Sequence, residues 1–128
     1  MMNNAQPASD NGFEAVLAGA RTFEANFDRF LADAGRGRVD AKLQASLCSQ
    51  ILLVTNEATR ALERGCEGKP NASQALTISI VRGIPHQFNA ALESALFRAR
   101  CKMLSDEQAR TTKDLYLVSA RVILAARA

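Results

Sequence analysis

Tryptophan is absent from this chain of 128 residues, and tyrosine and histidine each occur once, as Tyr116 and His86. A helical di-iron or di-manganese site needs paired Glu-x-x-His ligands, so a single histidine excludes that class of metal centre. Long apolar runs are also missing, and we therefore expect no membrane span. The first residues are polar without an apolar core, so we expect no secretory signal peptide.

Cysteine is scarce as well, and the positions of Cys48, Cys66 and Cys101 fit neither a disulfide framework nor a metal site. We therefore expect reduced thiols and a cytoplasmic location. The sequence has no phosphate-cradling glycine loop, Walker sequence or nucleophile elbow. From these absences we expect a non-enzymatic protein that uses no cofactor and no metal.

What the chain does contain is ordinary globular content rich in helix-forming residues. Apolar residues make up 48% and charged residues 23%, which is close to average usage and argues against general disorder. Alanine, leucine, arginine, glutamate and glutamine are frequent, whereas proline and glycine are few. We expect an all-α protein with one domain over residues 11–128, preceded by a disordered lead over residues 1–10.

Apolar residues recur at steps of three and four, which indicates amphipathic helices. The spacing predicts four helices, near residues 11–34, 40–64, 72–103 and 106–126. Short connections between them favour an up-down four-helix bundle. Local start signals support these bounds, since each of the following positions can cap a helix: Asn11 with Glu14, Asp40, Asn71 with Gln74, and Ser105 with Gln108. Gly35 is expected to end the first helix in the left-handed cap position.

The third segment is ambiguous at its start. Residues 76–81 alternate like a strand, but a lone strand would have no partner in this chain. A four-step apolar row supports a helix instead: Leu76, Ile80, Ile84, Phe88, Leu92, Leu96, Ala99 and Met103. We therefore predict one helix with a kink near residues 82–85, where Pro85 follows Gly83.

Two sets of apolar residues are candidates for a protein interface. The first is the phenylalanine row of the first helix, for which burial in the core is the simpler interpretation. The second lies on the last helix, which is apolar on most sides and therefore either sits centrally or contacts another subunit. The candidate anchors are Phe23, Phe27, Phe30, Leu117 and Leu124.

A basic face is the alternative candidate. Six residues of the last two helical segments could form it: Arg98, Arg100, Lys102, Arg110, Lys113 and Arg121. The net charge is only +3, and no aromatic platform is interleaved with these residues, so a solvated surface is the simpler interpretation. For His86 a kink-side hydrogen-bonding role is favoured over proton transfer, and Cys66 is expected to be the most accessible thiol.

The sequence therefore favours a non-catalytic protein-protein interaction module that acts through apolar helix faces, and we expect it to form a homodimer. Its length, helix content and lack of a site are similar to those of small bacterial adaptors, secretion chaperones and granule-coating helical proteins, and no motif selects one of these groups. The alternative is a nucleic-acid-associated regulator that binds through the basic residues.

Overall fold

The structure, a computed structural model, describes residues 8–127, and it describes side chains over residues 14–126. It is all-helical over this range, as predicted, and contains four helices, the third of which is bent by 38°. The bent helix consists of α3 and α4. The elements are α1 (Ala8–Gly35), α2 (Ala41–Gly65), α3 (Ala72–Arg82), α4 (Ile84–Arg100) and α5 (Asp106–Arg127).

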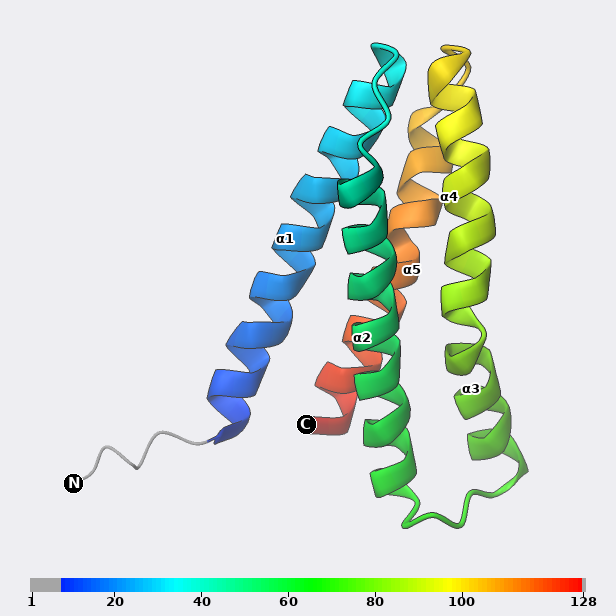
Figure 1. The fold of residues 1–128 in the computed structure, drawn as a ribbon. Helices are drawn as coiled ribbons and strands as arrows, with labels where there is room; N and C mark the ends of the chain where they lie inside the picture. The colour runs from blue at the N-terminus through cyan, green and yellow to red at the C-terminus, as the bar shows by residue number, and fades with distance from the viewer. Residues whose placement is uncertain (1–7, 128) are drawn as a thin grey trace, which may run out of the picture.

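The helices lie along a common direction, with their connections at the two ends of the molecule (Figure 1). The α1–α2 and α4–α5 connections lie at one end, and the α2–α3 loop lies at the other. Helices α2 and α5 make the most extensive contact, and α5 also contacts α1 and α4. The last helix is therefore central, which was one of the two predicted explanations of its apolar sides.

The start of α1 differs from the prediction. The helix begins at Ala8, so the expected disordered lead is wrong for residues 8–10, and residues 1–7 lie outside the described residues. Asn11 is therefore inside the helix and cannot be its N-cap. The cost of Asn or Gly inside a helix is only about 1 kcal/mol, which does not end a helix that tertiary packing supports.

The other three predicted N-caps are confirmed. The Asp40 carboxylate accepts a hydrogen bond of 3.0 Å from the Leu43 amide. Asn71 and Gln74 form a reciprocal capping box, with bonds of 2.8 and 2.9 Å between side chain and backbone. The Ser105 hydroxyl and the Gln108 side chain pair in the same way, at 3.1 Å each. Such caps need only residues three positions apart, so they can be read locally.

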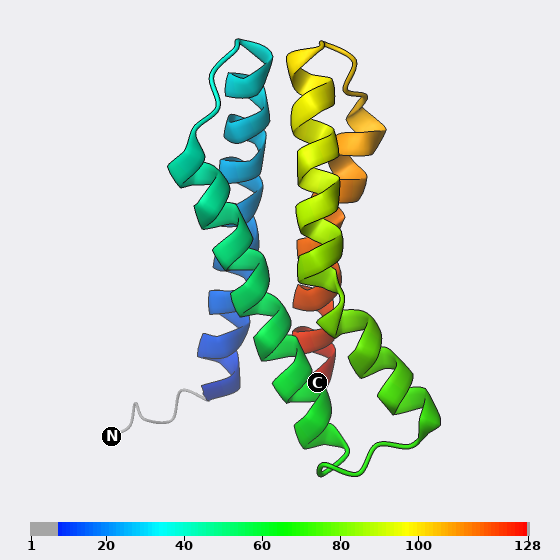
Figure 2. The same ribbon diagram turned by 45° about the vertical axis from the view of Figure 1, so that its right-hand side comes forward.

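The bend between α3 and α4 lies at the predicted place. Pro85 has no N–H to donate to the carbonyl four residues earlier, at Val81, and its ring crowds that carbonyl. Gly83 keeps helical dihedral angles, and its amide still donates to Ser79 and Ile80. The two segments therefore continue one another with a change of direction, and α3 swings away from the carboxyl end of α5 (Figure 2).

The core is centred on an aromatic cluster. The Phe23 ring stacks on Tyr116 at 4.5 Å between centroids and lies 5.7 Å from Phe88 and 6.0 Å from Phe27. These four side chains are buried and join α1, α4 and α5. Each aromatic pair adds about 0.5–1.5 kcal/mol beyond the burial of its area. Aliphatic side chains of α2 and α4, such as Ile51, continue the core along the molecule.

The helix ends correct one further prediction. Gly35 is the last residue of α1, and the left-handed residue is Gly37, two positions later, with φ +85°. Its amide and the next one donate back to Ala34 and Asp33, which is a Schellman motif. The ends of α2 and α4 have the same bonding, but Glu67 (φ 53°) and Lys102 (φ 59°) occupy the left-handed position. At these two ends a side chain stands where glycine is preferred.

The strained position at Glu67 gives a stability prediction. Glu67→Gly is expected to raise the free energy of unfolding by about 1 kcal/mol, because glycine adopts the left-handed conformation without a Cβ clash. Urea denaturation followed by circular dichroism measures the change. Glu67→Gln removes the charge but keeps the Cβ, so it should leave stability nearly unchanged. Equal stability of the two variants would contradict the assignment of strain to this residue.

Candidate functional site

The phenylalanine row is core and cannot serve as a surface anchor. Phe23, Phe27 and Phe30 are each at most 1% exposed within the single chain. No partner can reach them without opening the bundle, so the prediction of these three as interface residues is wrong. Helical spacing alone places such residues on one face, but it does not say whether the chain itself covers that face. Leu117 and Leu124 on α5 are half-buried and offer only part of their surface.

Other large apolar side chains are exposed instead. The described ones lie on α2, α3, α4 and α5 and in the α1–α2 and α4–α5 connections: Val39, Leu52, Leu53, Leu76, Ile80, Phe97, Met103 and Val118. Most stand singly, which is normal for a protein surface. Leu76 and Ile80 differ, because they are four residues apart on one helix and therefore neighbours, with exposed fractions of 63% and 58%.

Leu76 and Ile80 belong to the four-step row that correctly predicted a helix here, but they lie outside the core, and helix geometry gives the reason. A four-residue step exceeds the turn of 3.6 residues by about 40°. Counted back from the buried Phe88, the row has therefore turned by about 120° at Leu76 and has left the core side. Ile78 and Val81 face the core in α3 instead.

We call Ser73, Leu76, Thr77 and Ile80 the α3 face. No charged residue occurs between Ala72 and Val81, although most of α3 is exposed. The α3 face borders a groove of about 380 Å3 between α2, α3 and α5. Its lining consists of small, polar uncharged and aliphatic residues, namely Ala61, Leu62, Gly65, Ser73, Gln74, Thr77, Val122, Ala125 and Ala126. Exposed surface without charge is typical of the centre of a protein interface.

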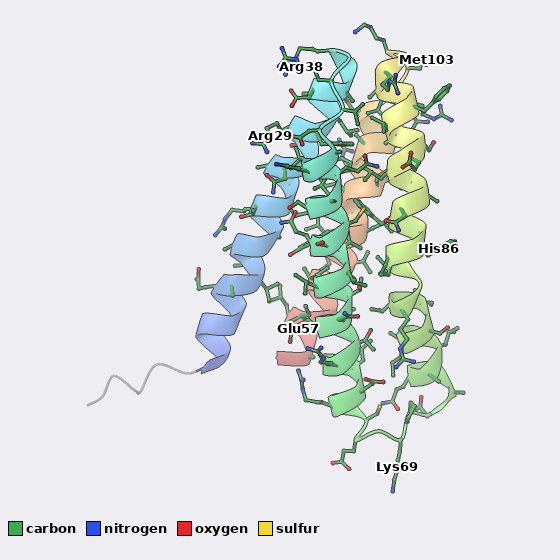
Figure 3. All side chains as sticks on the ribbon, viewed as in Figure 1. Arg29, Arg38, Glu57, Lys69, His86 and Met103 are labelled. Atoms are coloured by element: carbon green, nitrogen blue, oxygen red, sulfur yellow. The ribbon has the colours of Figure 1, made fainter. Side chains whose placement is uncertain are left out.

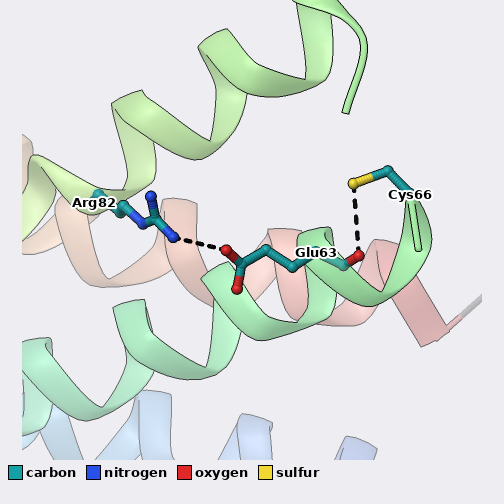
Figure 4. Close-up of polar contacts among 3 residues, drawn as sticks. All are labelled: Glu63, Cys66 and Arg82. Carbon is teal, nitrogen blue, oxygen red and sulfur yellow. Dashed lines mark hydrogen bonds and ion pairs between the residues drawn. The ribbon is translucent and has the colours of Figure 1, made fainter. Parts of the chain in front are cut away.

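An ion pair holds α3 against α2 on the other side of the helix. Arg82 donates to the Glu63 carboxylate at 2.7 Å (Figure 4). The Cys66 thiol donates to the backbone carbonyl of the same Glu63 at 3.5 Å. Both Arg82 and Glu63 are largely exposed, so this pair is worth at most about 1 kcal/mol and mainly orients the helix.

The predicted basic residues do not form one free face. Burial alone would lower the pKa of Lys113, but hydrogen bonds and charges from Asp28 and Glu24 outweigh it and raise the pKa above its ordinary value. The Lys113 ammonium lies 3.1 Å from Asp28 and 3.3 Å from Glu24, so α1 neutralises its charge. The Lys102 ammonium donates to the carbonyl of Gly35.

The four arginines of the predicted face are exposed and divided between two helices. Arg98 lines a polar hollow between α4 and α5 that also contains Glu107, so positive and negative charge meet there. Arg121 lies on the exposed side of α5. The four arginines therefore do not form the single basic face that the sequence suggested.

The thiols also differ from the prediction. Cys101, at the carboxyl end of α4, is the exposed one, whereas Cys66 and Cys48 are half-buried. The expectation that Cys66 is the most accessible is wrong, because its thiol turns back onto the Glu63 carbonyl. His86 is exposed on the outer side of the first turn of α4 (Figure 3).

The thiol of Cys48 has a shifted acidity that gives a second prediction. Burial raises its pKa, and the nearby Glu93 carboxylate raises it further. Because the thiolate is the reactive form, alkylation of Cys48 in the folded protein should accelerate at a higher pH than in the urea-unfolded chain. Glu93→Gln is expected to lower that midpoint. Mass spectrometry of timed iodoacetamide labelling follows the site, and identical folded and unfolded midpoints would refute the shift.

A cavity of about 280 Å3 lies between α1, α2 and α5, where α1 diverges from α2 (Figures 1 and 2). The described residues that line it are Ala15, Val16, Gln50, Leu53, Val54, Glu57, Tyr116 and Ile123. The side-chain oxygen of Gln50 is buried and has no hydrogen-bond partner among the described residues. Burial raises the pKa of Tyr116, so its phenol stays protonated at neutral pH. Sequence spacing gave no signal for this cavity.

Gly19 permits the close approach of α1 to Tyr116 beside the cavity. A Cβ at this position would stand 2.9 Å from the Tyr116 hydroxyl oxygen. The tyrosine ring is buried and stacked on Phe23, so it cannot move aside easily. A side chain at position 19 and the hydroxyl of Tyr116 therefore compete for the same space.

This competition predicts coupling between two substitutions. Gly19→Ala should stabilise the Tyr116→Phe variant by about 1 kcal/mol through helix propensity, since the hydroxyl is then gone. In the native background the clash should cancel that gain or reverse it. A double-mutant cycle of unfolding free energies measures the coupling. Additive effects of the two substitutions would show that the contact is absent.

Among the described residues no helix has a stretch long and apolar enough to cross a membrane, and no group of three or more His, Cys, Asp or Glu residues is placed to hold a metal ion. Comparison with protein-family models, with curated proteins and with solved structures found no match to this chain.

Proposed function

We propose that this protein is a non-catalytic interaction module, built as an up-down four-helix bundle, which binds another protein through the α3 face. The observation that carries the proposal is the exposure of Leu76 and Ile80 on a helix that has no charged residue from Ala72 to Val81. The first partner we propose is a second copy of the chain, in a reducing cytoplasm.

The groove beside α3 supports this mode of binding. Ser73 and Thr77 line the groove, and Leu76 and Ile80 lie three residues after them on the same helix. The protruding Leu76 and Ile80 side chains therefore form a ridge directly beside the groove. Two copies related by a two-fold axis could each place the ridge in the groove of the other. None of the described residues that line the groove is charged, so this arrangement would not bring like charges of the two copies close together.

The energy available from the two exposed side chains fits a specific contact of moderate strength. Full burial of a leucine or isoleucine gains about 1.5–3 kcal/mol. Because each is already partly buried, the pair should contribute roughly 3 kcal/mol, or about a hundredfold in the dissociation constant. Binding of α3 to a partner would also fix the helix, which in the free chain is packed chiefly on α2.

Nucleic-acid binding stays the alternative prediction and is the less supported one. The charge of Lys113 is balanced by two carboxylates, and the arginines are spread over two helices. A nucleic-acid interface gains most of its affinity from clustered cations that replace counterions. A binding assay with generic DNA at low salt separates the alternatives, since the proposed module should show no affinity.

The proposal predicts self-association that depends on the α3 face. Light scattering during size-exclusion chromatography at high micromolar concentration should give a mass above the 13.8 kDa of the monomer. The double variant Leu76→Glu/Ile80→Glu should give the monomer mass, because two buried carboxylates would have no partner. Circular dichroism should be unchanged, since both side chains are exposed in the single chain.

A matched control is available at the other end of the molecule. Phe97 and Met103 are about as exposed as the α3 pair, and Phe97→Glu/Met103→Glu should self-associate like the native chain. A monomeric native chain at high micromolar concentration would remove the self-association proposal. Loss of association in the control variant alone would move the interface away from α3.

A further inference from the structure

The cavity between α1, α2 and α5 has a chemical character of its own. It lies on the α1 side of the α2–α5 pair, whereas the α3 groove is bounded by α3. On the α1 side it is bordered by the small residue Ala15 and by Val16, and Gly19 lies next to Tyr116. The walls are aliphatic, formed in part by Val16, Val54 and Ile123.

The polar groups of the cavity come from α2 and α5: Gln50 and Glu57 are spaced along α2, and the Tyr116 hydroxyl of α5 can donate or accept a hydrogen bond. The Gln50 oxygen is buried without a partner, and a buried acceptor left unpaired is costly. Glu57 is half-buried and lies on the side of α2 toward α1 (Figure 3). Seven residues separate them, which is about 10 Å along the helix axis. Leu53 and Val54 lie between them in the lining.

No lysine or arginine occurs among the described residues of the lining. An anionic ligand would meet the Glu57 carboxylate without a cation to balance it, so the site disfavours carboxylates and phosphates. A cation at the Glu57 end and a neutral donor at the Gln50 end would satisfy both groups. Between these ends the ligand must be apolar to contact the aliphatic walls.

We propose that this cavity binds a small, elongated amino alcohol or a similar amine, whose ammonium pairs with Glu57 and whose neutral hydrogen-bond donor bonds to the Gln50 oxygen after the Gln50 side-chain amide turns toward the cavity. About six methylene groups bridge the distance between the two acceptors. The site is separate from the α3 face, and its occupation does not depend on self-association.

Tyr116 provides a direct readout. It is the single tyrosine, the chain has no tryptophan, and its ring lines the cavity, so intrinsic fluorescence reports on this site. Titration with 6-aminohexan-1-ol should give a saturable change in emission with half-saturation at about 1 mM. Hexylamine lacks the hydroxyl and should bind about fivefold more weakly, and 1,6-hexanediol lacks the charge and should bind about tenfold more weakly. 6-Hydroxyhexanoate should not bind.

Two substitutions assign the two ends of the ligand. Glu57→Gln should weaken the amino alcohol about tenfold and leave the diol unaffected, because only the ion pair is lost. Gln50→Met should weaken the amino alcohol about fivefold and leave hexylamine unaffected, because only the hydroxyl contact is lost. This crossed pattern distinguishes ligand contact from a general disturbance of the fold, which would weaken every compound.

A matched pair on α1 tests the location. Ala15→Leu should fill the cavity and abolish the fluorescence response, whereas Ala18→Leu makes the same change one turn away, outside the lining, and should leave it intact. The absence of a saturable response up to about 10 mM would overturn the proposal. Equal binding of the hydroxy acid, or an unaffected Ala15→Leu variant, would overturn it as well.

Discussion

The contact of Phe23 with Tyr116 and Phe88 holds three helices of the bundle together at one position along its length. It joins α1, α5 and α4 at one height, with a stacked ring pair at 4.5 Å. Toward the α1–α2 loop, Phe27 and Phe30 continue the core and keep the helices together. Toward the other end, residues 14–22 of α1 include no aromatic side chain, and α1 diverges from α2. The cavity beside Tyr116 lies where the two helices diverge.

The bend at Pro85 opens the same end of the molecule on its other side. Helix α3 leaves α5 and packs on α2, so the central α2–α5 pair is covered incompletely on both flanks. One flank has the cavity with the unpaired Gln50 oxygen, and the other has the uncharged α3 face. The two proposed sites thus share one structural cause, which is the divergence of the outer helices from a compact central pair. Their chemistry differs, because the cavity offers a carboxylate and hydrogen-bonding groups, whereas the α3 face offers mainly uncharged apolar surface.

The sequence predicted the helices, three N-caps and the bend well, because these depend on residues within one or two turns of each other. The four-step row correctly predicted a helix but did not show that Leu76 and Ile80 leave the core side, since that requires its drift of about 40° per step to be followed around the helix. It also named Phe23, Phe27 and Phe30 as possible anchors, because periodicity does not say which apolar stripe the chain covers. The cavity and the accessible thiol, Cys101, depend on how helices far apart in sequence are placed relative to each other. Local sequence patterns do not reveal this placement.

The central claim is that α3 exposes Leu76 and Ile80 in the isolated chain and covers them on binding. Methyl NMR with a soluble paramagnetic gadolinium chelate measures this directly. In dilute protein the methyl signals of Leu76 and Ile80 should broaden strongly, whereas those of the buried Ile78 and Val81 should not. At high concentration the broadening of the first pair should diminish. Equal broadening of Ile78 and Ile80, or an Ile80 signal that is protected in dilute protein, would contradict the account.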